Sequence, residues 1–459
     1  MKRTKPDLTV VGGGLAGSEA AWQAAERGLY VHLYEMRPFV ETGAHESHYL
    51  AELVCSNSLG SNLGDRASGL LKNELRKLGS LLIRCADETS LPAGGALAVD
   101  RNLFAQMVTE FIKNHPNIEI VRKECLEIPD GLTIISTGPL TSATFSESLA
   151  QLTGKDHLYF FDAIAPIVTY ESVNMDVAYR ASRYGRGEQA EGDYINCPFT
   201  EGEYQRFVHE LVTAERIELK EFELEIEKGV AAGAHKFFEG CLPIEIMANS
   251  GENSLAYGPM RPVGLDDPRT GCWPYAVVQL RQDDQAGSLY NLVGFQTNLK
   301  YSEQKRVLRL IPGLENAEFA RFGQMHRNTF IYSPAHLKAT LQFKERENLL
   351  FAGQITGVEG YVGNIATGLL AGWNSARIYW GKDPLELPPT TMLGALCHYI
   401  VYATPADFQP MKANFGILAA LEMPGKKIRG KRNRAAAYVS RAEQDLENFI
   451  VDIMDERKK

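Results

Sequence analysis

The sequence predicts an α/β protein in which a Rossmann-type dinucleotide-binding domain carries a large inserted α/β domain. Three observations lead to this prediction. The chain opens on a strand, a glycine turn, a helix and a second strand; two later apolar strands end in glycine; and about 200 residues separate those two strands. The length of 459 residues is enough for about three domains of ~150 residues each.

The opening unit has the pattern of a dinucleotide-binding βαβ motif. An apolar strand at 8–11 precedes the turn, an alanine-rich helix runs from Ser18 to about Arg27, and a second strand at 30–34 ends at Glu35. Glycines allow a pyrophosphate to approach the backbone at a helix N-terminus, and an acid at this distance accepts ribose hydroxyls. A purely structural turn is the alternative. We expect the cofactor to contact Gly12, Gly13, Gly14, Leu15, Ala16, Gly17 and Glu35.

Two later strands indicate which dinucleotide is bound. The strand at 131–138 ends in Thr137-Gly138, and the strand at 348–353 ends in Ala352-Gly353 and runs into Gln354 and a glycine-spaced helix. These endings resemble the second and third fingerprints of glutathione-reductase-like FAD-binding domains, and no second G-x-G-x-x-G is present for a separate nicotinamide domain. Each strand alone is more typical of an ordinary core strand that ends at a turn. Together they favour FAD, although the third fingerprint usually ends in Asp where this chain has Gln354.

The segment between these fingerprints predicts the domain organisation. It contains apolar strands at 275–280 and 292–296, a charged helical run at 214–228 and a turn-rich loop at 258–262. We therefore expect the first part of the FAD domain at 1–190, an inserted domain over the substrate at 191–330, and the rest of the FAD domain at 331–459.

Composition narrows the classes of partner. Lys and Arg number 48 against 57 Asp and Glu, a net charge of −9, so RNA binding would need a local basic patch. One segment has six cations in nine positions. Its alternative is a solvated charged face, which is the usual role of such a run. The candidate RNA-binding residues are Lys426, Lys427, Arg429, Lys431, Arg432 and Arg434.

The sequence also argues against a membrane-spanning protein, a secreted protein and a metal-binding site. No apolar stretch reaches the ~20 residues that a spanning helix needs, and the polar N-terminus has no signal-peptide pattern. Seven scattered cysteines without a C-x-x-C pair favour neither a disulfide framework nor a zinc site. We expect a reduced, cytoplasmic protein without a metal.

Two cysteines stand in contexts that suggest chemistry. Cys55 follows the second strand, where many flavoproteins place a loop against the flavin, and Cys241 lies in a Gly-Cys-Leu-Pro turn of the insertion. Tyr361 could stack on the flavin, and the stretch at 326–329 could face the flavin or a substrate carboxylate. For the other cysteines we expect packing roles: Cys85, Cys125, Cys197, Cys272 and Cys397.

These residues occur in longer stretches that resemble the folate- and FAD-dependent tRNA (uracil-5-)-methyltransferases across essentially the whole chain. The tripeptide Gly363-Asn364-Ile365 departs from the family's pattern, in which an acidic residue, a small residue and an alanine are expected at this place. The stretches are GGGLAGSEAAWQ (12–23), LVCSNSLGS (53–61), FFDAIAPIV (160–168), YINCPF (194–199), FFEGCLPIE (237–245), YGPMRPVGL (257–265), YAVVQLR (275–281), LYNLVGFQTNLK (289–300), IPGL (311–314), HRNTFI (326–331) and FAGQITGVEGYV (351–362).

The resemblance implies methylation without S-adenosylmethionine. The methylene of 5,10-methylenetetrahydrofolate passes to C5 of the T-loop uridine (position 54) of tRNA and is reduced to methyl through FAD with NAD(P)H. Uracil C5 becomes nucleophilic when a thiolate adds to C6, and the C5 proton then leaves to a base. By resemblance Cys241 is the nucleophile and Cys55 the acid/base, or the reverse, and Gln354 is the family's own residue.

Three alternatives remain at this point. The same chemistry could act on a ribosomal RNA uridine. A generic FAD-dependent small-molecule oxidoreductase would share the fingerprints without needing two cysteines and a basic segment. A non-catalytic FAD-dependent RNA-binding protein would need neither thiol. Nothing in the sequence implies a stable protein partner.

Overall fold

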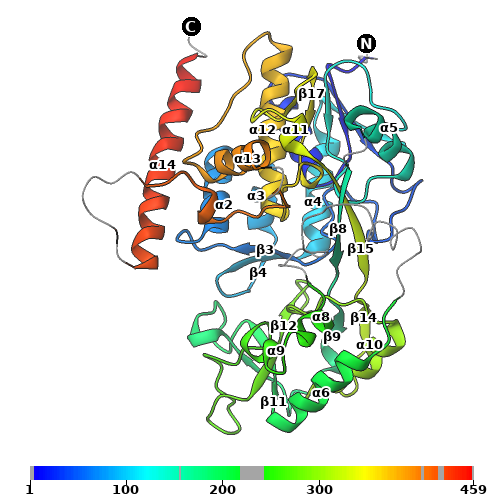
Figure 1. The fold of residues 1–459 in the computed structure, drawn as a ribbon, viewed down its shortest axis with the longest axis vertical. Coiled ribbons are helices and arrows are strands. Elements are labelled where there is room, and N and C mark those ends of the chain that lie inside the picture. The colour runs from blue at the N-terminus through cyan, green and yellow to red at the C-terminus, as the bar shows by residue number, and fades with distance from the viewer. Residues whose placement is uncertain are drawn as a thin grey trace.

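The computed structural model describes residues 5–154, 157–217, 242–404, 408–421, 428 and 430–456. The described residues form two bodies, each with its own six-stranded sheet (Figure 1). None of the described helices is long and apolar enough to cross a membrane.

The first body is built on a mostly parallel six-stranded sheet. Strand β1 pairs in parallel with β2 and β7, β17 pairs in parallel with β7, and β16 closes one edge antiparallel to β17. The three glycine-ended strands of the sequence are therefore neighbours, which confirms the predicted Rossmann-type fold. In spatial order the strands are β16 (Gln342–Phe343), β17 (Arg346–Phe351), β7 (Thr133–Ile135), β1 (Leu8–Val11), β2 (Val31–Glu35) and β6 (Ile118–Arg122).

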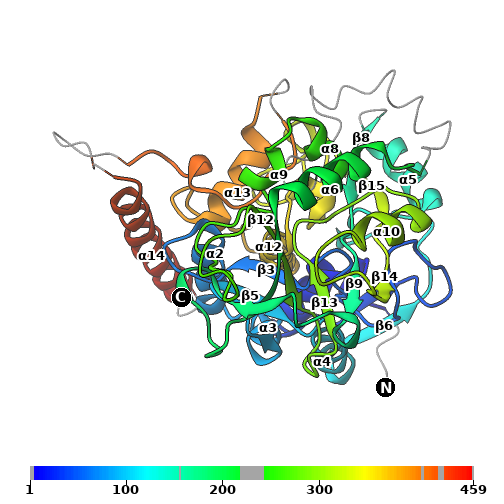
Figure 2. The ribbon, with the colours of Figure 1, turned by 90° about the horizontal axis from the view of Figure 1, so that it is seen from below.

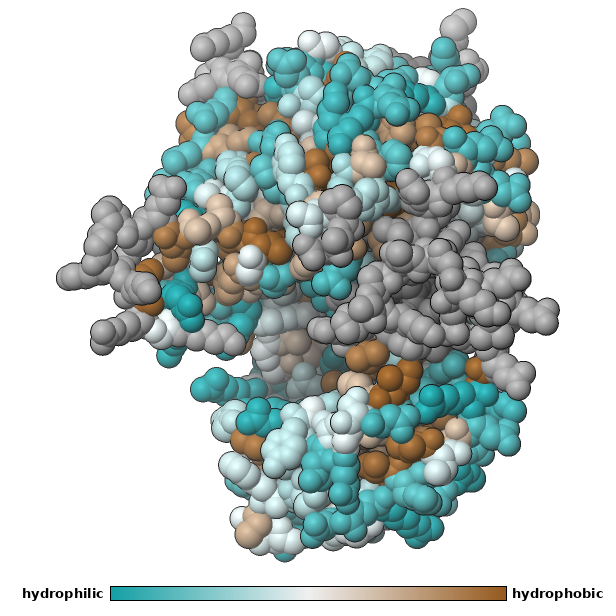
Figure 3. All heavy atoms as spheres, viewed as in Figure 1, coloured by the Kyte–Doolittle hydropathy of each residue, from teal (hydrophilic) through white to brown (hydrophobic). Residues whose placement is uncertain are grey.

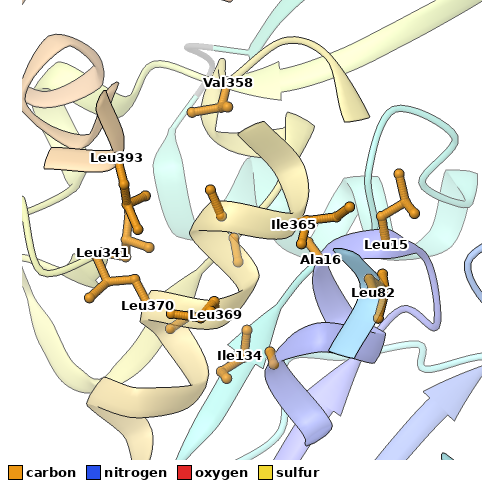
Figure 4. Packing of buried hydrophobic residues seen from close by; sticks show 14 of the residues in the cluster. Leu15, Ala16, Leu82, Ile134, Leu341, Val358, Ile365, Leu369, Leu370 and Leu393 are labelled. Carbon is orange, nitrogen blue, oxygen red and sulfur yellow. The ribbon is translucent and has the colours of Figure 1, made fainter. Parts of the chain in front are cut away.

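Glycines allow two helices to pack closely beside this sheet. Helix α1 (Leu15–Ala25) lies against α12 (Tyr361–Tyr379), and Figure 4 shows Ala16 beside Ile365 in this contact. A Cβ at Gly368 would lie 2.3 Å from the Ala16 carbonyl oxygen. A Cβ at Gly372 would lie 2.5 Å from the corresponding oxygen of Ala20. The glycine spacing of α12 thus serves helix packing.

Further helices and a small sheet surround the first body. Buried Glu74 of α2 accepts hydrogen bonds from the backbone N–H groups of Met392 and Leu393, and so caps α13. Helix α14 lies along one edge of the molecule (Figures 1 and 2). These elements are α2 (Ala67–Lys77), α3 (Leu81–Glu88), α4 (Arg101–Asn114), α5 (Ala143–Thr153), α11 (Ser333–His336), α13 (Met392–Tyr402), α14 (Lys431–Glu456), β3 (Ser58–Ser61), β4 (Ser90–Leu91) and β5 (Ala96–Val99).

The second body contains an antiparallel six-stranded sheet with its own hydrophobic core. Strands β8 (His157–Ala163) and β15 (Met325–Ile331) pair antiparallel where the chain passes between the bodies. In spatial order the sheet strands are β10 (Tyr179–Ala181), β11 (Tyr194–Phe199), β12 (Ala276–Gln282), β13 (Leu289–Leu292), β9 (Ile167–Thr169) and β14 (Phe319–Arg321), with helices α6 (Glu201–Thr213), α8 (Ile244–Asn249), α9 (Ser254–Tyr257) and α10 (Tyr301–Leu308).

The predicted domain limits can be placed against these elements. Strands β9 and β10 belong to the second sheet although both precede residue 191. The second limit falls at the end of β15. Of the charged run predicted to be helical at 214–228, the described part at 214–217 is not helical, and the rest lies outside the described residues. The division at 190 and 330 stays a prediction.

Candidate active site

A cavity lies at the carboxyl ends of β1, β7 and β17, where parallel α/β sheets bind ligands. Gly17 is the one predicted cofactor residue that does not line it. A Cβ at Gly17 would overlap the Gly12 carbonyl oxygen, so this glycine permits α1 to pack on its own turn. The cavity is lined by Gly12, Gly13, Gly14, Leu15, Ala16, Glu35, Thr137, Gly138, Gly353, Gln354 and Tyr361, among others.

The glycine turn presents an open helix N-terminus to this cavity. Gly14 is the N-cap of α1, and no side chain caps the helix there. A Cβ at Gly14 would meet no protein atom within 4 Å, because it would point into the cavity. Unpaired N–H groups at a helix N-terminus attract anions, so the turn fits a pyrophosphate.

Asn364, in the first turn of α12, supplies a second sign that this cavity accepts a polar ligand. Its side-chain oxygen is buried and has no hydrogen-bond partner within the described part of the chain, and the residue lines the cavity. A buried acceptor without a donor is costly. A ligand N–H or O–H group would satisfy it, so the residues present fit a bound dinucleotide.

Glu35 forms a buried ion pair with the guanidinium of Arg37. Its oxygens accept hydrogen bonds from the Gly13 N–H at 3.2 Å and from Arg37 Nε at 3.0 Å and Nη2 at 3.1 Å. Burial alone would raise the pKa of Glu35, but the hydrogen bonds and charge of Arg37 outweigh it and lower that pKa. Arg37 also pairs with Glu52 at 3.2 Å. Arg37 is not among the predicted site residues, although its position two residues after Glu35 is a signal that could have identified it.

A second cavity of about 440 Å³ continues the first and lies between the two bodies. The two cavities share Gln354 and Tyr361 in their linings. The second is lined from the first body by Cys55 and Ser56, and from the second body by Arg281 and Gln296, among others. Figure 3 shows the surface hollowed between the bodies. A ligand that extends along the first cavity would thus reach Cys55.

Cys55 is half-buried in the connection between β2 and β3. The backbone N–H groups of Cys55 and Ser56 donate to the Tyr361 hydroxyl oxygen at 2.8 and 3.1 Å. Burial raises the pKa of Tyr361, so its hydroxyl stays protonated. Tyr361 thus holds the Cys55 loop at the junction of the two cavities, a role that the sequence did not suggest.

Two buried arginines also hold this loop. Arg101 Nη1 donates to the Leu53 carbonyl at 3.1 Å, while its Nη2 pairs with Asp283 of the second body at 2.7 Å. Arg281 of the second body donates to the residues after Cys55. Neither arginine was a sequence candidate, because only the fold brings them to the loop.

Cys241 lies outside the described residues. The described chain resumes at Leu242, and the N–H of Ile244 donates to the Gln296 carbonyl at 2.7 Å. Gln296 lines the second cavity, so the chain resumes beside it. The stretch at 326–329 lies in β15, and its side chains are also outside the described part.

The remaining cysteines divide into two groups. Cys85, Cys197 and Cys397 are buried, as expected for packing residues, and burial raises the pKa of Cys85 and of Cys397 to about 12. Cys125 is half-buried and packs against the hydrophobic core of the first body, and it also lines the first cavity. For Cys272 the packing prediction was wrong, because this cysteine is exposed.

The basic segment is described in part. Lys426, Lys427 and Arg429 lie outside the described residues, as does the side chain of Lys431 at the start of α14. Arg432 and Arg434 are exposed in the first turn of that helix. The RNA-binding role of this segment stays a prediction.

Comparison with known proteins adds to this geometry. The model of the family "Glucose inhibited division protein A" matches residues 7–383. The structure of Aquifex aeolicus GidA in the form II crystal matches 99% of this chain and 76% of that chain at a TM-score of 0.68 and 16% identity, which supports the fold.

Curated relatives resemble the chain over nearly its full length. A methylenetetrahydrofolate--tRNA-(uracil-5-)-methyltransferase TrmFO of Bacillus cereus (strain AH187) is 56% identical over 443 residues, covering 96% of this chain and 98% of its own. One of Halalkalibacterium halodurans is 56% identical over 445 residues, covering 97% and 99%. The chain therefore belongs to the glucose inhibited division protein A family and, within it, to the methylenetetrahydrofolate--tRNA-(uracil-5-)-methyltransferases.

Proposed function

We propose that this enzyme methylates C5 of the T-loop uridine of tRNA. The one-carbon unit comes from 5,10-methylenetetrahydrofolate and is reduced through FAD with NAD(P)H in the cytoplasm. The observation that carries the proposal is the position of Cys55, where a dinucleotide-binding cavity meets a second cavity between the two bodies. The relatives named above carry this activity in their names.

The residues that would hold FAD surround the first cavity. The open N-terminus of α1 at Gly14 suits the pyrophosphate, the Glu35–Arg37 pair suits a ribose, and Asn364 offers its unpaired oxygen. Thr137, Gly138, Gly353 and Gln354 complete the set. Bound FAD would supply the electron pair that reduces the transferred methylene to methyl.

The two cysteines divide the work on the uracil. The Cys241 thiolate forms a bond to C6, and the C5–C6 electron pair moves into an enolate, so that C5 can attack the methylene carbon. Cys55 takes the C5 proton, and the electron pair of that C–H bond expels tetrahydrofolate from the methylene carbon, which leaves a C5 methylene group. Reduction of this methylene to methyl returns an electron pair to the ring, and that pair expels the Cys241 thiolate from C6. The Tyr361 hydroxyl keeps the Cys55 backbone in place during these steps.

Trapping with a fluorinated substrate tests these roles. An RNA with 5-fluorouridine at the target position should become covalently bound, because fluorine cannot leave C5 as a cation. We expect Cys241→Ala to lose methylation and trapping but keep its FAD. Cys55→Ala should lose methylation and still trap the RNA, because proton removal follows attack. Cys272→Ala, an exposed thiol at neither cavity, should behave as wild type.

Gel-shift and mass measurements of the RNA–protein adduct distinguish the outcomes. Trapping by Cys241→Ala together with its loss in Cys55→Ala would reverse the two roles. Full methylation by both single variants would contradict the mechanism.

A further inference from the structure

Arg281 is a buried cation of the second body that reaches the Cys55 loop of the first. It lies on β12 and is 7% exposed. Its Nε donates to Asn57 Oδ1 at 2.9 Å, and its Nη2 donates to Ser56 Oγ at 2.7 Å. The guanidinium therefore binds the side chains of the two residues that follow Cys55.

The same loop is fixed from three other directions. Arg101 on α4 holds its beginning and Tyr361 on α12 holds its middle. The Asn57 amide donates to the carbonyl oxygens of Val99 at 3.0 Å and Gln282 at 2.8 Å. A loop tied to this many segments keeps one backbone conformation, so the position of the Cys55 thiol depends on both bodies.

The charges of the two arginines are compensated differently. Arg101 pairs with Asp283 at 2.7 Å. Arg281 contacts the neutral side chains of Ser56 and Asn57, and no carboxylate lies within ion-pair distance of it among the described residues. Burial lowers the pKa of Arg281, as expected for a cation without an adjacent counter-charge.

A charge of this kind favours a nearby anion. Cys55 is close enough to Arg281 and to Arg101 to act on both electrostatically, and positive charge beside a thiol favours the thiolate. Among the residues that the structure describes, the other titratable or charged groups that face Arg281, Cys55 or the second cavity are Tyr194, Asp283, Glu359, Tyr361 and Lys412.

We propose that Arg281 is a positioning residue of the methylation reaction, which fixes the Cys55 loop from the second body and supplies the positive charge that stabilises the Cys55 thiolate. This inference rests on the proposed function, in which Cys55 exchanges a proton with the substrate. Because β12 belongs to the second sheet, the reactivity of Cys55 requires the two bodies to be docked.

The test uses the purified full-length flavoprotein. The rate at which iodoacetamide alkylates Cys55 is followed from about pH 6 to pH 10 by mass spectrometry of the Cys55 peptide. We expect Arg281→Gln to raise the pH midpoint of alkylation by about one unit and to slow alkylation near neutral pH about tenfold, since an adjacent opposite charge shifts a titration by about 1–3 units.

Two further variants complete the experiment. Arg281→Lys keeps the charge but loses the two-pronged contact, so its alkylation midpoint should stay near wild type while kcat for methylation falls. Arg183→Gln is the control, because Arg183 is another arginine of the second body that donates to Gln279 and to backbone carbonyls away from Cys55. It should leave the alkylation profile unchanged.

Specific results would overturn the inference. An Arg281→Gln protein that keeps its flavin and alkylates with the wild-type pH profile contradicts the role of the charge. If Arg281→Gln loses its flavin, an Arg281→Lys enzyme with wild-type kcat contradicts the positioning role. Because alkylation needs no RNA, a shifted profile in Arg281→Gln together with a wild-type enzyme that fails to methylate tRNA would refute the proposed function and leave the effect of Arg281 on Cys55 standing.

Discussion

At the scale of single residues, the glycines of the first turn have separable roles. Gly12 has φ of +104°, and a Cβ there would lie 2.6 Å from the Ser136 carbonyl oxygen, so it is required by the backbone itself. Gly17 is required by helix packing. Gly14 has an ordinary backbone conformation and open space around its Cβ position, so only a ligand would exclude a side chain there.

Gly14→Leu should therefore fold but fail to retain FAD, because the leucine side chain would occupy the pyrophosphate position. The matched control is Gly202→Leu on α6, where a Cβ also meets no atom within 4 Å and which lines neither of the two cavities. Flavin absorbance after gel filtration, together with the melting temperature, checks this prediction. A yellow Gly14→Leu protein would contradict the proposed cradle.

The site residues that could be predicted from the sequence are those that lie in a recognisable local pattern. The glycine turn, Glu35, Thr137-Gly138 and Gly353-Gln354 all reach the first cavity except Gly17, because each follows directly from a strand end. Arg37, Arg101 and Arg281 went unrecognised. Their partners are side chains and carbonyls whose positions depend on tertiary packing, which one sequence does not display.

At the scale of elements, buried parallel strands were easier to predict than the rest. All four residues of β1 and all three of β7 are buried, so both appear as plain apolar runs. Strands β9 and β10 have three residues each and are partly exposed, which leaves too short a pattern to recognise. Neither strand was predicted from the sequence for this reason.

The contact between α2 and α13 predicts a pH dependence of stability. Burial raises the pKa of Glu74 to about 7 from its ordinary value of 4.5. Between these two values the folded state binds the proton more tightly than the unfolded chain. The contribution of Glu74 is thus fully present below about pH 4.5 and is lost as the pH rises through about 7.

We expect the free energy of unfolding of the wild type, relative to Glu74→Gln, to fall by about 3 kcal/mol between pH 4.5 and pH 7, at about 1.4 kcal/mol per unit of pKa shift. Glutamine occupies the same space without titrating, so it serves as the reference. Urea unfolding at several pH values provides the measurement. An unchanged difference across this range would show that Glu74 is not a buried titrating group.

The basic segment at the start of α14 predicts a salt effect. Neutralising Lys426, Lys427, Arg429, Lys431, Arg432 and Arg434 should weaken RNA binding and reduce the log–log salt slope by ~0.7–0.9 for each RNA phosphate that the protein no longer neutralises. Flavin reduction by NAD(P)H should not change. Neutralising Arg84 and Lys305, which are exposed elsewhere, is the control. An unchanged slope in the segment variant would identify it as a solvated face.

At the scale of the whole molecule, the two bodies meet at the Cys55 loop, which Arg281 contacts from the second body. The first body supplies the dinucleotide cavity and the Cys55 loop, and the second supplies Arg281 and Gln296 to the adjoining cavity. Net charge of −9 leaves RNA recognition to local surfaces. We therefore expect the substrate to enter between the bodies.

The most direct test of the proposed activity is the identity of the RNA that becomes methylated. The purified protein is incubated with unmodified total RNA, NADPH and 5,10-methylenetetrahydrofolate labelled in its methylene carbon, and the RNA is then fractionated and its nucleosides analysed. We expect label in 5-methyluridine of the tRNA T loop, and no label with Cys55→Ala. Label confined to ribosomal RNA, or no label in RNA while the flavin is still reduced by NADPH, would contradict the proposed function.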